Sequence, residues 1–258
     1  MSRRANSRFL GTLLAGVVAL CVPALAWGAS GGGGMGPGSG SSSSSASGDS
    51  GTSSPTAQPA DAAVTASGDG VTIVTQESAL LNNALQITGS VPSSDAGKTV
   101  EIERSGAKTN WSWQPTAQAT VASDGSFAAD WQTDHIGRFA LRAVVGGAGA
   151  ADASSGLPTV NITVYLPASA TLYGPGFYGR RTACGVVLRR STIGVAHRWL
   201  PCGTPVSIYY DGHSMIVPVI DRGPYANGAN WDLTMAAGRA LGMGATAKVG
   251  AVSLPRNG

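Results

Sequence analysis

Apolar and polar residues alternate in short runs through the middle of the chain. Seven such runs occupy residues 71–74, 85–91, 100–102, 117–122, 127–131, 139–145 and 160–164. Because successive side chains of a strand point to opposite faces, this period of two predicts half-buried β-strands. An Asp124-Gly125 pair between two of the runs is a typical turn. The pattern predicts an antiparallel β-sandwich over residues 70–166.

The pattern changes in the last ninety or so residues, which contain both strand and helix signals. Two apolar runs, 206–210 and 214–220, flank an Asp-Gly pair, which predicts a hairpin. Pro218 within the second run indicates an edge, a bulge or a barrel corner. Thr234 followed by the run 235–241 and then a glycine predicts a short capped helix. Strands crowded around one short helix favour a small closed barrel.

The first 29 residues have a different composition. Three arginines precede the apolar run 10–22, and Ala24-Leu25-Ala26 follows it, which predicts a secretory signal peptide cleaved after Ala26 or Ala29. The apolar run is too short to span a membrane. The alternatives are an uncleaved anchor and lipidation at Cys21, although Leu20 stands before it where a small residue is expected.

Residues 30–69 are mostly Gly, Ser, Ala, Thr and Pro. Such a segment buries too little apolar surface to offset its ordering entropy, so we expect a flexible linker. The part after residue 166 carries nine Lys and Arg against three Asp. This balance suits a polyanion such as cell wall, or simply a basic solvated surface. Export makes nucleic acid an unexpected partner.

Export also bears on the cysteines. Removal of the signal peptide leaves Cys184 and Cys202, and disulfides persist in extracytoplasmic compartments. We expect the two to be paired, with a stabilisation of roughly 3 kcal/mol in the chain-entropy model. Two thiols without further cysteines or clustered histidines do not make a closed zinc site, and the chain offers no metal or cofactor motif.

Four motifs lie in the last ninety residues. They are Tyr-Gly-Pro-Gly-Phe-Tyr-Gly-Arg-Arg-Thr-Ala at 173–183, Ala-His-Arg-Trp-Leu-Pro-Cys-Gly-Thr at 196–204, Asp-Arg-Gly-Pro-Tyr at 221–225 and Asp-Leu-Thr at 232–234. In this order they resemble the RlpA-like (rare lipoprotein A) double-psi β-barrel family, which is related to expansins and barwin. The resemblance implies a six-stranded double-psi β-barrel with a substrate groove and, in enzymes, lytic cleavage of peptidoglycan glycan strands. Residues 70–166 resemble immunoglobulin-like or fibronectin-like modules by pattern only.

Glycosidic cleavage needs a proton for the leaving oxygen, and the barrel part has only three carboxylates, Asp211, Asp221 and Asp232. A lytic transglycosylase manages with one acid/base group, because the C6 hydroxyl of the muramic sugar attacks its own anomeric carbon. Since Asp211 falls in the hairpin turn, we assign the role first to Asp221 and then to Asp232. The alternatives are a turn stabiliser and a helix-start residue. His197 matches the family's histidine and is the third catalytic candidate; its alternative is structural.

Aromatic and basic residues complete the expected groove. Sugar stacking is expected of the tyrosines and carboxylate binding of the arginines, with core packing and solvated surface as the alternatives. These candidates are Tyr173, Tyr178, Tyr225, Arg180, Arg181 and Arg222. One departure stands against catalysis: the family often carries acids just after Thr-Ala-x-Gly, where this chain has Val186 and Arg189.

The sequence therefore predicts an exported all-β protein of the cell envelope. Its expected parts are a signal peptide (1–29), a Gly/Ser-rich linker (30–69), an immunoglobulin-like β-sandwich (70–166) and an RlpA-like double-psi β-barrel (167–258). The expected function is that of a lytic transglycosylase, which cleaves the MurNAc-GlcNAc bond and leaves 1,6-anhydro-MurNAc. Two alternatives are a non-catalytic, expansin-like module that binds and loosens the wall, and a structural domain. Peptidoglycan is the expected partner, with no membrane insertion after signal cleavage.

Overall fold

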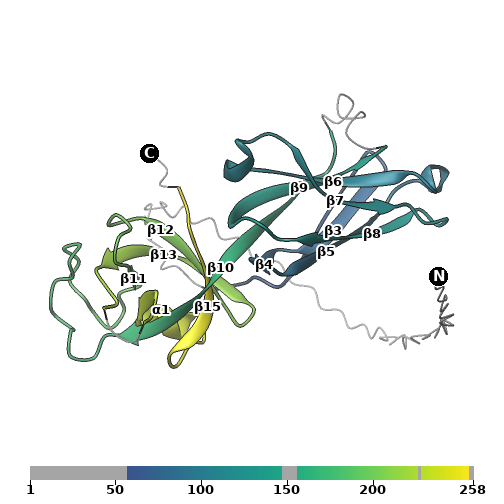
Figure 1. Cartoon of the computed structure of the whole chain (residues 1–258). Helices are drawn as coiled ribbons and strands as arrows, with labels where there is room; N and C mark the ends of the chain where they lie inside the picture. The colour runs from purple at the N-terminus through teal and green to yellow at the C-terminus, as the bar shows by residue number, and fades with distance from the viewer. Residues whose placement is uncertain (1–56, 147–155, 226–227, 256–258) are drawn as a thin grey trace, which may run out of the picture. The chain divides into compact units, whose positions relative to one another are not determined.

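The computed structural model describes residues 57–146, 156–225 and 228–255. The predicted signal peptide and most of the predicted linker lie outside these residues. Within them the chain is mainly β, with one short α-helix and two 3-10 turns, η1 (Ser93–Asp95) and η2 (Ala107–Thr109) (Figure 1). None of the helices in the described ranges is long and apolar enough to cross a membrane.

The first part of the described chain forms two groups of paired strands. One is an antiparallel sheet in the order β2 (Ala63–Gly68), β3 (Val71–Gln76), β5 (Ala84–Ser90) and β8 (Ser126–Gln132). The other joins β4 (Ser78–Leu80), the first half of β10 (Val160–Tyr173), β9 (Gly137–Val145), β6 (Thr99–Gly106) and β7 (Gln114–Thr120).

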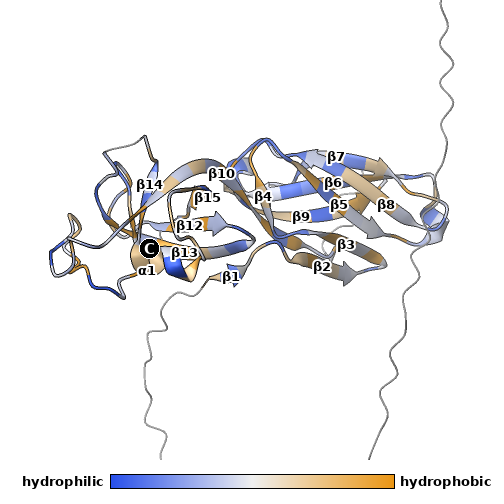
Figure 2. Ribbon diagram, turned by 90° about the horizontal axis from the view of Figure 1, so that it is seen from below, coloured by the Kyte–Doolittle hydropathy of each residue, from blue (hydrophilic) through white to orange (hydrophobic). Residues whose placement is uncertain are grey.

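The alternation in the sequence places one face of these strands in a common core. Along β8, for example, buried and exposed residues alternate without interruption. Hydrophobic and hydrophilic residues are interspersed along the ribbon of these strands (Figure 2). Trp131 and Phe139 meet edge to face in this core at 5.7 Å between ring centres. All seven runs predicted as strands from residue 71 to 164 are confirmed.

Paired strands are present before residue 70. Strand β1 (Gln58–Pro59) pairs with the barrel strand β13, and β2 pairs with β3, although both lie in the range predicted as linker. The residues of β2 are mostly small, and none of them is fully buried, so the sequence there carries no clear hydrophobic period. Backbone pairing with a neighbouring strand holds them instead, because it needs no particular side chain.

The second part of the described chain is a closed six-stranded barrel. Its strands follow the order β14, β11, β13, β12, β15 and β10, and a further pairing between β10 and β14 closes the ring. The strands are the second half of β10, then β11 (Val195–Ala196), β12 (Pro205–Tyr210), β13 (His213–Asp221), β14 (Trp231–Thr234) and β15 (Ala247–Ser253). Helix α1 (Met235–Ala240) packs against β14 and β10 (Figure 1).

Local sequence signals explain several features of the barrel. Asp211 and Gly212 both have positive φ, 46° and 74°, as a tight hairpin turn between β12 and β13 requires. Thr234 caps α1 by accepting a hydrogen bond from the Ala237 backbone N–H at 3.2 Å. The β11–β13 pairing shifts register just after Pro218, so the predicted hairpin, helix and irregular strand are confirmed.

Candidate functional site

Two carboxylates of the barrel lie in one row across neighbouring strands. Ala196 of β11 pairs with Asp221 of β13 on one side and with Asp232 of β14 on the other. Asp232 in turn pairs with Thr171 of β10. Strands are about 4.8 Å apart, so the two Asp α-carbons lie roughly 10 Å apart, with both side chains on the same face. The barrel thus brings together the two acids that the sequence predicted as catalytic.

Asp232, like Asp221, is half-buried. Burial raises the pKa of its carboxyl, and the charge of Asp221 raises it further, against the opposing effect of a hydrogen bond from Thr171. Thr171 Oγ1 donates this bond to Asp232 Oδ1 at 2.7 Å. Asp232 therefore keeps a proton at a higher pH than an ordinary aspartate.

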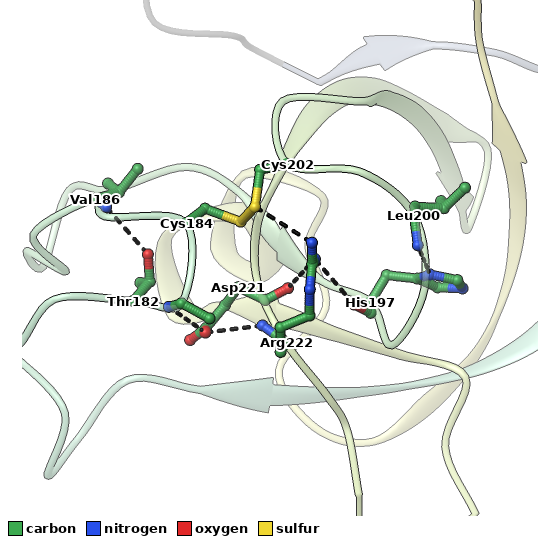
Figure 3. Close-up of a disulfide and its surroundings, with 9 residues drawn as sticks. Thr182, Cys184, Val186, His197, Leu200, Cys202, Asp221 and Arg222 are labelled. Atoms are coloured by element: carbon green, nitrogen blue, oxygen red, sulfur yellow. Dashed lines mark hydrogen bonds between the residues drawn. A yellow bond between two sulfur atoms is a disulfide. The ribbon is translucent and has the colours of Figure 1, made fainter.

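Asp221 has a different environment at the end of β13. Its Oδ1 accepts two backbone hydrogen bonds, from Ala183 N–H at 2.9 Å and from Arg222 N–H at 2.8 Å (Figure 3). Ala183 precedes Cys184, which forms a disulfide with Cys202, with 5.6 Å between their α-carbons. The predicted disulfide is confirmed. It attaches the segment that supplies one donor of Asp221 to the loop after β11.

His197 organises its own loop. Its Nδ1 accepts the backbone N–H groups of Trp199 at 3.2 Å and Leu200 at 3.0 Å, so the ring proton is on Nε2. The ring packs on Trp231 at 4.4 Å between centres, and burial, Arg198 and Arg222 lower the pKa of the imidazole. The ring points away from the Asp221 carboxylate (Figure 3), whereas the His197 backbone N–H donates to the Asp221 carbonyl oxygen at 3.2 Å.

A groove of about 350 Å³ contains Asp232. Its lining residues come from β10, the loop after it, the loop after β13, and β14: Thr171, Leu172, Tyr173, Gly174, Pro175, Phe177, Pro224, Tyr225 and Asp232. The Tyr173 hydroxyl is buried and has no hydrogen-bond partner among the described residues. Burial and the charges of Asp221 and Asp232 raise its pKa, so Tyr173 stays protonated beside the two acids.

The remaining candidates occupy varied positions. Tyr225 is exposed on the groove, whereas Tyr178 lies under the Arg190 guanidinium at 5.3 Å. Arg180 and Arg181 are exposed, and Arg181 donates to the Gly185 carbonyl at 2.9 Å.

Arg222 supports the rim of the site. Its guanidinium donates to the His197 carbonyl oxygen and to Cys202 Sγ, both at 3.4 Å. These contacts connect the residue after Asp221 to the loop that follows β11, so Arg222 contributes to the position of the acid. At the segment where the family often carries acids, Val186 presents a 37 % exposed apolar side chain.

Sequence reasoning missed three residues that shape the site. Thr171 sits in a strand with no motif, and only its pairing with Asp232 shows its role. Arg198 lies inside the motif at 196–204, but its partners, the carbonyls of Pro224 at 2.6 Å and Ala229 at 2.9 Å, are distant in sequence. Trp199 is the residue after Arg198, and its side chain is 82 % exposed. The signal for Trp199 was a large apolar ring within the motif at 196–204.

Comparison with known proteins identifies the barrel. Residues 167–254 match the family model described as "Lytic transglycolase". The chain is 42% identical over 81 residues to the "Probable endolytic peptidoglycan transglycosylase RlpA" of Aquifex aeolicus, which covers 31% of this chain and 36% of that protein. A Synechocystis protein of the same name is 45% identical over 76 residues, 29% of this chain and 24% of the relative.

A third relative, the "Endolytic peptidoglycan transglycosylase RlpA" of Campylobacter jejuni, is 33% identical over 76 residues, which cover 29% of this chain and 28% of the relative. The matched segment thus spans about a quarter to a third of the length of these curated relatives. The barrel is RlpA-like, as the motifs predicted.

Proposed function

We propose that this chain is an exported enzyme that cleaves peptidoglycan glycan strands by a lytic transglycosylase reaction in its C-terminal barrel. One observation carries the proposal: a half-buried Asp232, whose pKa is raised, lies in a groove and in one row with Asp221. A carboxyl that retains its proton beside a second carboxylate is what protonation of a glycosidic oxygen requires. The names of the RlpA relatives point to the same substrate.

In this mechanism Asp232 donates its proton to the oxygen of the MurNAc-GlcNAc bond as the bond to the anomeric carbon breaks. Asp221, held by two backbone N–H groups, stabilises the positive charge that develops on the sugar. The C6 hydroxyl of the muramic residue then attacks the anomeric carbon. Its proton passes to the Asp232 carboxylate, which restores the acid and leaves a 1,6-anhydro end.

This assignment reverses the order that the sequence suggested, in which Asp221 came first. Burial favours Asp232 as the proton carrier. His197 is proposed to position the loop that follows β11, because its Nδ1 is occupied by backbone donors. Tyr173 and Tyr225 are proposed to contact the sugar, since both line the groove.

The test is digestion of peptide-stripped peptidoglycan with the full chain, followed by mass spectrometry of the products. The wild type is expected to generate 1,6-anhydro-muramic ends, and Asp232→Asn is expected to abolish them. Asp211→Asn is the matched control, because it changes the third carboxylate of the barrel in a hairpin turn whose positive φ suits Asn equally. If Asp232→Asn cleaves and Asp221→Asn does not, the proton carrier is Asp221.

The second candidate is a non-catalytic module of expansin type that binds and loosens the wall. Val186 and Arg189 favour it, because they stand where the resembled family often has carboxylates. This function predicts that the wild type pellets with peptide-stripped peptidoglycan but yields no anhydro ends. Cleavage that depends on Asp232 would eliminate it.

We also propose that the strands before the barrel form an immunoglobulin-like sandwich. Two groups of strands that share one apolar core support this assignment, with Ile73 and Ile87 of one group and Leu141 of the other fully buried. Slow hydrogen exchange at these three positions is the expected observation. Fast exchange at all of them would contradict a sandwich core.

Export to the cell envelope completes the proposal, since the substrate lies outside the cytoplasm. It rests on the signal-like composition of residues 1–29. N-terminal sequencing of the protein recovered from the envelope is expected to begin after Ala26 or Ala29. A protein that keeps residue 1 would contradict cleavage.

A further inference from the structure

Exposed aromatic side chains of the barrel gather on the loops around the groove. Among the described barrel residues the exposed large aromatics are Phe177, Trp199 and Tyr225, with exposed fractions of 53%, 82% and 76%. Isolated exposed apolar residues are common and carry little meaning. Here, however, Phe177 and Tyr225 line the groove itself. Trp199 follows Arg198, which donates a hydrogen bond to a residue of the groove lining, Pro224. The clustering points to a contact surface.

Strand topology brings Trp199 and Tyr225 to the same edge of the barrel. Strands β11 and β13 are parallel neighbours, and they end at the paired residues Ala196 and Asp221. The loops that carry the two aromatics therefore start side by side, with Trp199 three residues beyond its strand and Tyr225 four. Arg198 connects the loops directly, because its Nε donates to the Pro224 carbonyl at 2.6 Å.

The turn that carries Trp199 is held in place on both sides. The Trp199 backbone N–H donates to His197 Nδ1, and the His197 ring packs on Trp231. A few residues later the chain is anchored by the Cys184–Cys202 disulfide. A large apolar ring is thus presented to solvent by a well-supported backbone. Such a ring loses little conformational entropy when a ligand covers it.

We propose that Trp199 and Tyr225 together form a stacking platform that extends from the rim of the groove and binds sugar residues of the glycan strand next to the cleavage site. The C–H faces of a pyranose ring are apolar and its hydroxyl edges are hydrated, which matches a large ring exposed at a wet surface. The excess of basic residues in the barrel suits the lactyl carboxylates of a peptide-free strand. The inference rests on the proposed function for the identity of the ligand.

Binding is measured with the full chain carrying Asp221→Asn and Asp232→Asn, so that the strand stays intact. The probes are peptide-free sacculi in a pelleting assay and soluble peptide-free glycan strands in a calorimetric titration. Trp199→Ala is expected to weaken binding about tenfold and Trp199→Phe about threefold. Tyr225→Ala is expected to weaken it by about the same factor as Trp199→Ala. Because Trp199 is so exposed, its truncation is expected to leave the unfolding temperature unchanged.

Trp111→Ala is the matched control, because Trp111 is a 73 % exposed tryptophan outside the barrel. Its affinity is expected to equal that of the parent. Affinity of Trp199→Ala within twofold of the parent, or equal losses for Trp111→Ala, would overturn the inference. These results are independent of catalysis: a wild type that forms no anhydro ends but binds through Trp199 contradicts only the proposed function. A wild type that forms anhydro ends, together with a Trp199→Ala variant that binds as tightly as its parent, contradicts only the stacking platform.

Discussion

Replacement of both Cys184 and Cys202 by Ser is expected to lower the free energy of unfolding by about 3 kcal/mol. The two residues are 18 positions apart. A cross-link over a loop of this length removes about 11 cal/mol/K from the entropy of the unfolded chain, or about 3 kcal/mol at 25 °C. Cys202 is exposed, so little packing is lost, and a serine oxygen can still accept from Arg222. The effect should therefore arise in the unfolded state.

Urea unfolding of the oxidised wild type and the double variant, both carrying Cys21→Ser, measures this difference. A loss of about 3 kcal/mol corresponds to about 6–12 °C in unfolding temperature if the barrel unfolds together with the strands before it, and to about twice that if the barrel unfolds alone. The reduced wild type should coincide with the variant, and reductant should leave the variant unchanged. A loss below about 1 kcal/mol would refute the loop-closure argument.

Three further predictions concern other parts of the molecule. Thr171→Val removes the hydrogen bond that lowers the pKa of Asp232. Because the proposed cleavage needs this carboxyl protonated, the activity should persist to higher pH before it declines. Cleavage rates across a pH series measure the shift. The Arg104 guanidinium lowers the pKa of Asp134 to about 2, from 3.8 in the unfolded chain. The ionised Asp134 therefore stabilises the fold fully above pH 3.8, and this stabilisation is lost as the pH falls toward 2. Asp134→Asn should weaken this acid dependence in urea unfolding curves. Gly89→Ala should lower the free energy of unfolding by about 3 kcal/mol, because a Cβ there overlaps backbone and ring atoms of neighbouring strands. Gly244→Ala has open space around the new Cβ, so its free energy of unfolding should stay within about 1 kcal/mol of the wild type in the same assay.

The strands before the barrel were predictable because each buries one face. In the run 127–131, for example, buried and exposed residues alternate, and the observed strand β8 is longer by only one residue at each end. Strands without such a face were missed. β4 has only three residues, and β11 only two, both buried. A strand this short has no visible period, and its place is set by partners that lie far away in the sequence.

Strand β10 illustrates a second limit. Its first residues pair with β9 and β4, and its last residues pair with β15 and β14. The sequence places a domain boundary near residue 167 because the composition and the motifs change there. The backbone continues through that point as one strand of 14 residues. Main-chain hydrogen bonds do not depend on the side chains, so the strand continues although the side-chain pattern changes.

The ranking of the two acids shows why the site was only partly predictable. Asp221 stands at the end of a predicted strand, where the following Gly-Pro turn should expose it, so the sequence places it first. The proton affinity of Asp232, however, depends on burial by the closed barrel and on Thr171, which lies 61 residues away. One donor of Asp221, the Ala183 N–H, is 38 residues away. A motif identifies the candidate carboxylates, but the pairing that closes the barrel supplies the burial and the hydrogen bond that act on the pKa of Asp232.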